Sequence, residues 1–164
     1  MFQAEHEAIV ISRIDKGSSL TWDWEEYKSM TFTRQLINET LRTGPIAPGF
    51  IRRMLKDIEV KGAWTLMVVT AAQQYNPEAF EEPHKFNPSR WKELESSIIS
   101  NNFTPFGGGT RQCAGAEYCK AFMAVFFHKL LTKYRWTKGG GGDIIRNPLL
   151  GFKDGIHIKV SVKH

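Results

Sequence analysis

Long apolar runs are missing from this 164-residue sequence, and their absence argues against a membrane-spanning segment within it. The longest uncharged apolar stretch, Ala121 to Phe127, falls far short of the ~20 residues that a spanning helix needs. The first residues also lack the charged start and apolar middle of a secretory signal. We therefore expect no membrane span and no anchor in the chain as written.

Concentrated positive charge is missing as well, although the net charge is +5. The 22 basic residues are scattered among 17 acidic ones, without a basic tract or the aromatic motif of RNA-binding domains. Internal repeats are absent, and low complexity is confined to the Gly139–Gly142 run. These features give no support to a nucleic-acid partner, and none is expected.

Cysteine is scarce, because only Cys113 and Cys119 are present. On one helix, residues six apart point to largely opposite faces, so a disulfide between them is not expected. Reduced thiols are typical of a protein that faces the cytosol. Each cysteine must therefore be interpreted from its own surroundings.

What the sequence does contain is the composition of a globular protein, with 41% hydrophobic and 24% charged residues, in a length that suits one domain. Apolar residues at helical spacing predict four helices. They are expected at Phe2–Ile14, from Asp23 onward, over Phe32–Leu41 and at Glu117–Tyr134. Asp23 and Glu26 have the spacing of a capping box. The fourth helix is apolar around most of its circumference, which indicates burial on several sides.

Strands are predicted where β-branched and aromatic residues dominate, over Phe50–Val60 and Trp64–Thr70. Near the C-terminus, Ile156–Val162 alternates apolar and polar residues after an Asp-Gly turn, the pattern of a half-buried strand. Between these regions, Asn-Pro pairs at Asn76 and Asn87 bracket a turn-rich passage. The sequence therefore predicts an α+β fold that is mainly helical.

The most informative segment is "FGGGTRQCAGAEY", which begins at Phe106. Cys113 follows three glycines whose backbone amides can turn toward a sulfur anion, and a helix begins close after it with the positive end of its dipole. Because the thiolate is the form of cysteine that binds a metal, these surroundings suit a single metal-ligating cysteine. Arg111 is placed to reach a carboxylate on the same ligand, and Phe106 to pack an aromatic face beside it.

Spacing excludes three other kinds of site. A phosphatase loop needs an arginine six residues after the cysteine, where this chain has Cys119. Zinc needs four ligands, and neither Cys119 nor His128 completes a set. A dinucleotide loop needs G-x-G-x-x-G between a strand and a helix, which the segment lacks. A buried structural cysteine beside a glycine turn stays open on spacing alone.

Three motifs follow one another along the chain. They are Glu39-x-x-Arg42, then Phe86-x-Pro88-x-Arg90-Trp91, then Phe106-x-x-Gly109-x-Arg111-x-Cys113-x-Gly115. In this order they resemble the motifs of the cytochrome P-450 monooxygenases, and the third matches the haem-thiolate loop of that family at every specified position. The segments "INETLR" and "NPEAFEEPHKFNPSRW" are most similar to the plant branch that oxidises steroid, triterpenoid and diterpenoid skeletons.

This resemblance implies that the loop supplies the metal ligand and part of a cofactor pocket. Cys113 is the expected ligand of the iron of haem b, an iron protoporphyrin. The expected cofactor-binding residues of the loop are Phe106 on the proximal side, Gly109, Arg111 at a propionate, and Gly115. No catalytic residue beyond the haem ligand is identified.

A further match to the family is an arginine five residues before an aspartate, which commonly binds a haem propionate in its members. Here the pair is Arg52 and Asp57, so the resemblance implies the same role for Arg52. Arg53 is the competing candidate. An exposed charge at a strand edge is the simpler interpretation of either arginine.

Glu39 and Arg42 share a helix face because they are three residues apart. Taken alone, the default interpretation is a solvent-exposed ion pair worth ~0.5 kcal/mol or less. The resemblance implies instead that Arg90 joins them, so that two guanidiniums hold a buried carboxylate. The expected role of this triad is structural, to hold the scaffold on the haem side.

Nearly the whole chain resembles only the C-terminal part of the family. The N-terminal half, with its membrane anchor and oxygen-activating helix, has no counterpart, and the hairpin near Gly62 is shorter than usual. We therefore interpret residues 1–164 as a single partial domain. Apolar residues of the fourth helix, such as Phe122 and Phe126, are then expected to be left open, and the isolated chain to be poorly soluble or partly molten.

Two functions are expected from these observations. In the first, the chain is the haem-binding part of a monooxygenase that inserts one oxygen atom from O2 into a lipophilic sterol or terpenoid, with electrons from an NADPH-dependent reductase. Such a protein is expected at the cytosolic face of the endoplasmic reticulum membrane. In the second, the chain is a truncated, non-catalytic fragment or interaction module that at most binds haem and is cytoplasmic as written.

Overall fold

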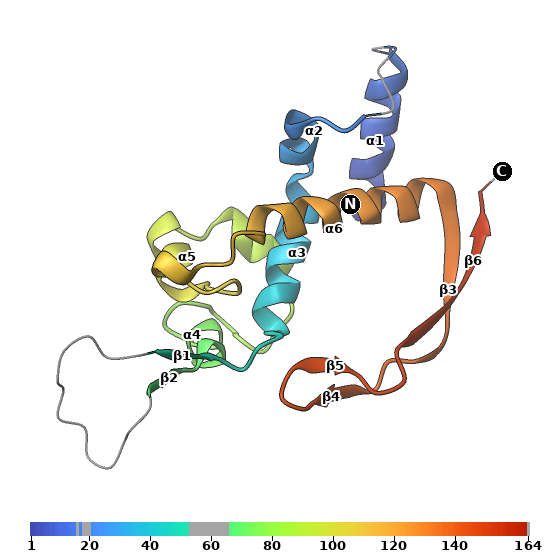
Figure 1. The fold of residues 1–164 in the computed structure, drawn as a ribbon. Helices are drawn as coiled ribbons and strands as arrows, with labels where there is room; N and C mark the ends of the chain where they lie inside the picture. The colour runs from blue at the N-terminus through green and yellow to red at the C-terminus, as the bar shows by residue number, and fades with distance from the viewer. Residues whose placement is uncertain (16, 18–20, 53–65, 164) are drawn as a thin grey trace.

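The computed structural model describes residues 1–15, 17, 21–52 and 66–163. Its helices are α1 (Phe2–Asp15), α2 (Trp24–Ser29), α3 (Thr31–Thr43), α4 (Thr70–Gln74), α5 (Ser96–Asn102) and α6 (Ala116–Lys133), with the 3-10 turns η1 (Pro88–Lys92) and η2 (Gly109–Arg111). In Figure 1, α6 runs across the upper end of α3, with α1 and α2 above it and the turn-rich segments below. Three helices, α1, α2 and α3, therefore meet around α6.

Two helix ends follow directly from their residues. The Asp23 carboxylate accepts from the N–H of Glu26 at 2.7 Å, and the Glu26 carboxylate accepts from the N–H of Asp23 at 3.3 Å. The predicted capping box at the start of α2 is therefore confirmed. α3 ends just before Gly44, because the following Pro45 disfavours helical conformation in the residue that precedes it.

The core is a small apolar cluster between α1, α2, α3 and α6. Its buried members are Ile9, Tyr27, Met30, Ile37 and Ala124. Trp22, Leu41, Ala121, Met123 and Phe127 pack against it from the edges. Full burial of one large apolar side chain contributes about 1.5–3 kcal/mol. The small Ala124 is completely buried in the middle of α6, where the other helices approach most closely.

The strands form three separate antiparallel pairs. They are β1 (Phe50–Arg52) with β2 (Leu66–Val68), β3 (Tyr134–Gly141) with β6 (Ile156–Val162), and β4 (Ile144–Arg146) with β5 (Leu150–Phe152). Thr70, predicted to end a strand, begins α4 instead, and Tyr134, predicted to end a helix, begins β3. The rest of the predicted Phe50–Val60 strand and the hairpin near Gly62 lie outside the described residues.

The prediction that Ile156–Val162 is half-buried is wrong. Every residue of β6 is exposed, and so are all but one of the residues of β3. The alternation itself is present, because Val160 stands opposite Trp136 and Val162 opposite Tyr134, which gives the ladder an apolar face. A period of two shows which residues share a face, but it does not show whether another element covers that face.

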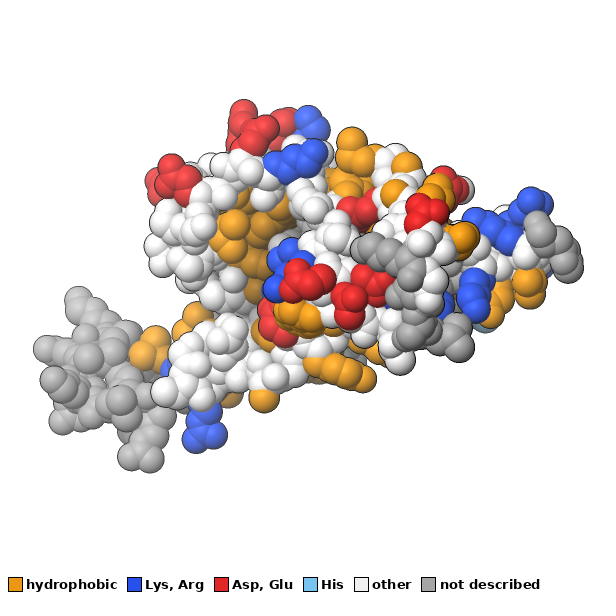
Figure 2. Space-filling model, turned by 90° about the horizontal axis from the view of Figure 1, so that it is seen from above, with side chains coloured by type: hydrophobic (Ala, Val, Ile, Leu, Met, Phe, Trp, Pro, Cys, Tyr) orange, Lys and Arg blue, Asp and Glu red, His pale blue; other side chains and the backbone are white. Residues whose placement is uncertain are grey.

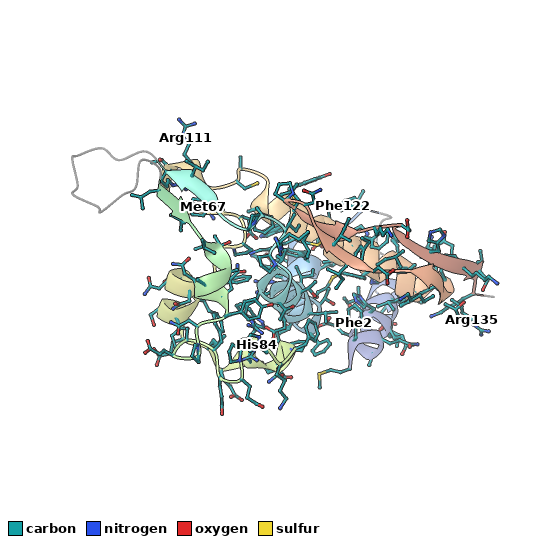
Figure 3. All side chains as sticks on the ribbon, turned by 90° about the horizontal axis from the view of Figure 1, so that it is seen from below. Phe2, Met67, His84, Arg111, Phe122 and Arg135 are labelled. Atoms are coloured by element: carbon teal, nitrogen blue, oxygen red, sulfur yellow. The ribbon has the colours of Figure 1, made fainter. Side chains whose placement is uncertain are left out.

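α6 is likewise covered on one side only. Ala124 and His128 are buried, whereas Phe122 and Phe126 are 60% and 51% exposed. Figure 2 shows hydrophobic side chains lying open among charged ones on one face of the molecule, and Figure 3 shows Phe122 at the surface. The predicted burial of this helix on several sides is met only in part. In the described part of the chain, no helix has both the length and the apolar character needed to cross a bilayer.

We expect the isolated chain to associate or to stay partly molten, because contiguous exposed apolar surface drives association. Replacing both Phe122 and Phe126 by glutamine should raise the monomer fraction in size-exclusion chromatography with light scattering. A sharp, cooperative thermal transition of a wild-type monomer at low concentration would contradict this expectation.

Candidate functional site

The glycine-rich loop between α5 and α6 is closed by backbone hydrogen bonds. The N–H of Cys113 donates to the carbonyl of Phe106 at 3.0 Å, and the N–H of Gly107 donates to the carbonyl of Thr104 at 3.0 Å. Gly107 and Gly109 have φ angles of +74° and +70°, a region that strains residues with a side chain. The two glycines therefore let the loop turn back, so that Cys113 lies against the backbone of Phe106.

Cys113 lies exposed on this loop, just before the first turn of α6, and its thiol is free. The interpretation as a buried structural cysteine is thus wrong, and so is the assumption that Cys113 and Cys119 share one helix. A Cβ added at Gly115 would lie 3.9 Å from each of their sulfurs, yet both thiols are free. Among the described residues, no three His, Cys, Asp or Glu side chains gather as a metal site.

β1 brings Arg52 to the loop from 56 residues away in the sequence. Its Nη2 donates to the carbonyl of Gly108 at 3.4 Å, and its guanidinium lies 4.0 Å from the centroid of the Phe50 ring. The pairing of Phe50 with Val68 holds this strand in place. A half-buried cation therefore stands beside the glycines. Arg53, the competing candidate, lies outside the described residues.

The other loop residues leave one side of the loop open. Arg111 is exposed, and Figure 3 shows its side chain projecting outward from the molecule. Phe106 is half-buried below the turn. A Cβ added at Gly108 or Gly109 would meet no atom within 4 Å. The fold thus gathers a free thiol, two guanidiniums and open space around one loop.

Glu39 holds two arginines in the interior. Arg42 makes two parallel bonds to it, from Nε to Oε2 and from Nη2 to Oε1, both 2.9 Å long. Arg90 donates from Nε to Oε1 at 3.1 Å. The side chains of Glu39 and Arg42 are 0% exposed, and that of Arg90 is 9% exposed. The interpretation of Glu39 and Arg42 as a solvent-exposed pair is therefore wrong.

The triad ties α3 to the turn-rich passage. The remaining arginine donors reach the backbone carbonyls of Gln74, Glu81, Glu82, Pro83 and Lys85. The N–H of Asn87 and the indole N–H of Trp91 also donate to Glu39, at 2.8 Å and 3.0 Å. Sequence reasoning missed these last two donors. A backbone N–H leaves no signature in the sequence, and the only available signal was that Trp91 adjoins Arg90.

Burial alone would raise the pKa of Glu39, but the hydrogen bonds from Arg42 and Asn87 and the charges of Arg42 and Arg90 outweigh it and hold that pKa below its ordinary value of 4.5. A carboxyl of this kind stabilises the fold above its unfolded pKa, and that stability is lost as the pH falls through the folded pKa. We therefore expect acid to loosen α3 from η1 below about pH 4.5, seen as faster amide hydrogen exchange in residues 31–43 and 88–92. In Glu39→Gln this pH dependence of exchange should disappear. If it persists, Glu39 is not the group whose protonation loosens α3 from η1.

The family model described as Cytochrome P450 matches residues 3–154. The chain belongs to the cytochrome P450 family. It is 54% identical to cucurbitadienol 11-hydroxylase of Siraitia grosvenorii over 98% of its length, and 50% identical to beta-amyrin 16-alpha-hydroxylase CYP87D16 of Maesa lanceolata over 99%. In both comparisons the chain spans 35% of the length of the relative.

A solved cytochrome P450 has the same fold over this region. The retinoic acid bound cyanobacterial CYP120A1 superimposes with a TM-score of 0.74 and 25% sequence identity, over 98% of this chain and 39% of that one. The chain therefore has the mixed helix and sheet fold of one part of a cytochrome P450, as the motifs predict.

Membership in the cytochrome P450 family implies a haem cofactor, and the residues around the glycine loop fit such a group. The free thiol of Cys113 is a soft donor that suits iron. Arg52 presents a guanidinium beside the loop, and guanidiniums bind carboxylates such as the propionates of haem. No atom lies within 4 Å of a Cβ added at Gly108 or Gly109, so nothing packs against the loop at these two glycines.

Proposed function

We propose that residues 1–164 form one partial domain, the haem-binding part of a monooxygenase that inserts one oxygen atom from O2 into a lipophilic sterol or terpenoid. The observation that carries the proposal is the free, exposed thiol of Cys113 on a glycine loop beside Arg52. High identity to a cucurbitadienol hydroxylase and a beta-amyrin hydroxylase supports the substrate class.

Each residue of the loop has a proposed role toward haem b. The Cys113 thiolate ligates the iron, and the positive end of α6 stabilises the negative sulfur. Arg52 and Arg111 pair with propionates, and Phe106 packs on the proximal side. Gly109 and Gly115 keep side chains away from the ring and the sulfur. When bound, haem supplies the activation of O2 for the insertion.

We further propose an NADPH-dependent reductase as the electron donor and the cytosolic face of the endoplasmic reticulum membrane as the place of action. Family membership supports both proposals. Lys120 on α6, whose Nζ lies 5.9 Å from the centroid of the Phe106 ring, adds positive charge beside the loop. Such charge favours docking of an acidic electron-transfer partner.

A haemin titration followed by absorbance tests the site. We expect one haemin per chain, with binding about tenfold weaker in Arg52→Gln, since a charge-assisted bond at a partly exposed position contributes about 1.5–3 kcal/mol at most. Arg135→Gln is the control, because Arg135 lies at the opposite end of the molecule from Arg111 in Figure 3. Failure to take up haemin, or equal weakening by the two variants, would refute the proposed site.

The exposed Phe122 and Phe126 favour a second candidate, a truncated, non-catalytic fragment or interaction module that at most binds haem. Product formation by the haem-loaded chain separates the two candidates. The haem-loaded chain would be incubated with a reductase, NADPH and either cucurbitadienol or beta-amyrin, followed by mass spectrometry. A product heavier by one oxygen supports the monooxygenase, whereas haem binding without product supports the fragment.

A further inference from the structure

Two buried histidines that the proposed function does not use meet where α1 packs on α6. His6 is 0% exposed and His128 is 4% exposed, and their Nδ1 atoms lie 3.2 Å apart. The other ring nitrogen of His6, Nε2, lies 3.1 Å from Oγ1 of Thr33 on α3. The Thr33 hydroxyl donates to the carboxylate of Glu5 at 2.6 Å. Four side chains from three helices thus form one continuous chain of hydrogen bonds.

The carboxylate at the end of this chain sets the direction of every bond. A carboxylate only accepts, so the single hydroxyl proton of Thr33 is used on Glu5. The bond between His6 and Thr33 must then be donated by Nε2–H of His6, which leaves Nδ1 of His6 as an acceptor. His128 must therefore donate from its own Nδ1–H. The two rings are held in opposite tautomers, Nε2–H in His6 and Nδ1–H in His128.

Glu5 cannot turn away to neutralise a proton elsewhere, because it caps α3. The backbone N–H groups of Phe32 and Thr33 donate to its two oxygens at 2.7 Å and 3.0 Å. These are N–H groups of the first helical turn, which have no partner inside the helix. The hydrogen-bonded chain therefore joins the start of α3 to α1 and, through the two histidines, to α6.

The charged groups that face the histidines are Glu5 and Arg13 of α1, Glu26 of α2 and Lys129 of α6. Glu5 and Glu26 favour an added proton, but burial of the two rings outweighs them. Arg13 is bound to Glu26, with Nε 2.6 Å from Oε1, and α3 contributes the uncharged Thr33. Burial, with the charges of His6, Arg13 and Lys129, lowers the pKa of His128 to about 4, and burial lowers the pKa of His6.

We propose that these four residues form an acid-sensitive clasp that holds α1 against α3 and α6. A first proton can enter at Nε2 of His128, since no hydrogen bond between described residues uses that atom. A second proton must enter at Nδ1 of His6, where it sets two N–H donors against each other. Because a histidine takes up a proton more readily once the clasp has opened to water, acid favours the open clasp before either proton has entered the closed one. The clasp lies apart from the glycine loop and does not depend on the proposed haem site.

Amide hydrogen exchange of the full chain, read in peptides of α1 and α6, tests the clasp. A histidine with a pKa of about 4 when folded and 6.5 when unfolded stabilises the fold fully above pH 6.5 and loses that stability as the pH falls towards 4. These two values predict that protection of α1 falls by about 30-fold between about pH 7.5 and about pH 5, after correction for intrinsic exchange.

Two variants separate the clasp from a general effect of acid. His128→Asn keeps an N–H donor near the Nδ1 position but does not titrate, so its loss of protection should be much smaller. His157→Asn alters an exposed histidine of β6 and should keep the full loss. Equal loss in His128→Asn and in the wild type would overturn the proposal.

Exchange of the C2 hydrogens of the histidine rings, measured by mass spectrometry at low concentration, provides a test that needs no variant. In the wild type, the rings of His6 and His128 should exchange slowly and titrate below the ordinary pKa of 6.5. Titration of either ring like a free histidine would overturn the proposal.

Discussion

Replacing Glu39 by glutamine should weaken the attachment of α3 to η1 by about 3–5 kcal/mol, because removing one member of a buried ion network leaves uncompensated charge. Arg42 would suffer most, since it is completely buried and makes two bonds to this carboxylate. The neutral amide also offers Arg90 and Trp91 a weaker acceptor. Amide hydrogen exchange in residues 31–43 at neutral pH should quicken by at least about 100-fold.

The matched control for this change is Glu82→Gln. Glu82 pairs with Lys85 at 2.9 Å, also three residues apart, but the two side chains are 64% and 62% exposed. An exposed pair contributes at most about 1 kcal/mol, so exchange in residues 31–43 should hardly change. If Glu39→Gln has an effect as small as Glu82→Gln, the buried triad does not hold these segments together.

Cys113→Ser should remove sulfur from the coordination of bound iron. A serine hydroxyl is a harder and much weaker ligand than a thiolate, so the variant keeps only the contacts to the propionates and cannot reproduce the sulfur bond. X-ray absorption at the iron edge of the haemin-loaded chain measures this directly, because sulfur scatters differently from nitrogen and oxygen.

Cys119→Ser is the control for this experiment. Its sulfur borders Gly115 as closely as that of Cys113 does, but Cys119 lies within α6 rather than on the loop. The sulfur signal should therefore persist in Cys119→Ser. If the signal persists in Cys113→Ser, or is lost in Cys119→Ser, Cys113 is not the sulfur ligand of the iron.

The features that sequence reasoning predicted well are those set by near neighbours in the chain. The capping box of Asp23 and Glu26 depends on a spacing of three residues, and its two hydrogen bonds are present. The helical period likewise placed α1, α3 and α6 close to their observed bounds. Arg90 joins Glu39 from 51 positions away, and only the family resemblance, not spacing, could bring it into the triad.

The features that sequence reasoning missed depend on which elements pack against one another in the fold. Ile156–Val162 has the alternation of a half-buried strand, yet burial is a property of neighbours that the pattern does not contain. His6 and His128 lie 122 positions apart, and nothing in either local pattern links them. Thr70 has strand propensity but begins α4, because tertiary context outweighs a preference of this size.

The most direct test of the haem-thiolate assignment is the carbon-monoxide difference spectrum of the reduced, haemin-loaded chain. A thiolate ligand shifts the Soret band of the carbon-monoxide complex strongly to the red, so we expect that band in the wild type and in Cys119→Ser, and its absence in Cys113→Ser. Haem uptake without a red-shifted band, or a band that survives in Cys113→Ser, would contradict the claim that the Cys113 thiolate holds the iron.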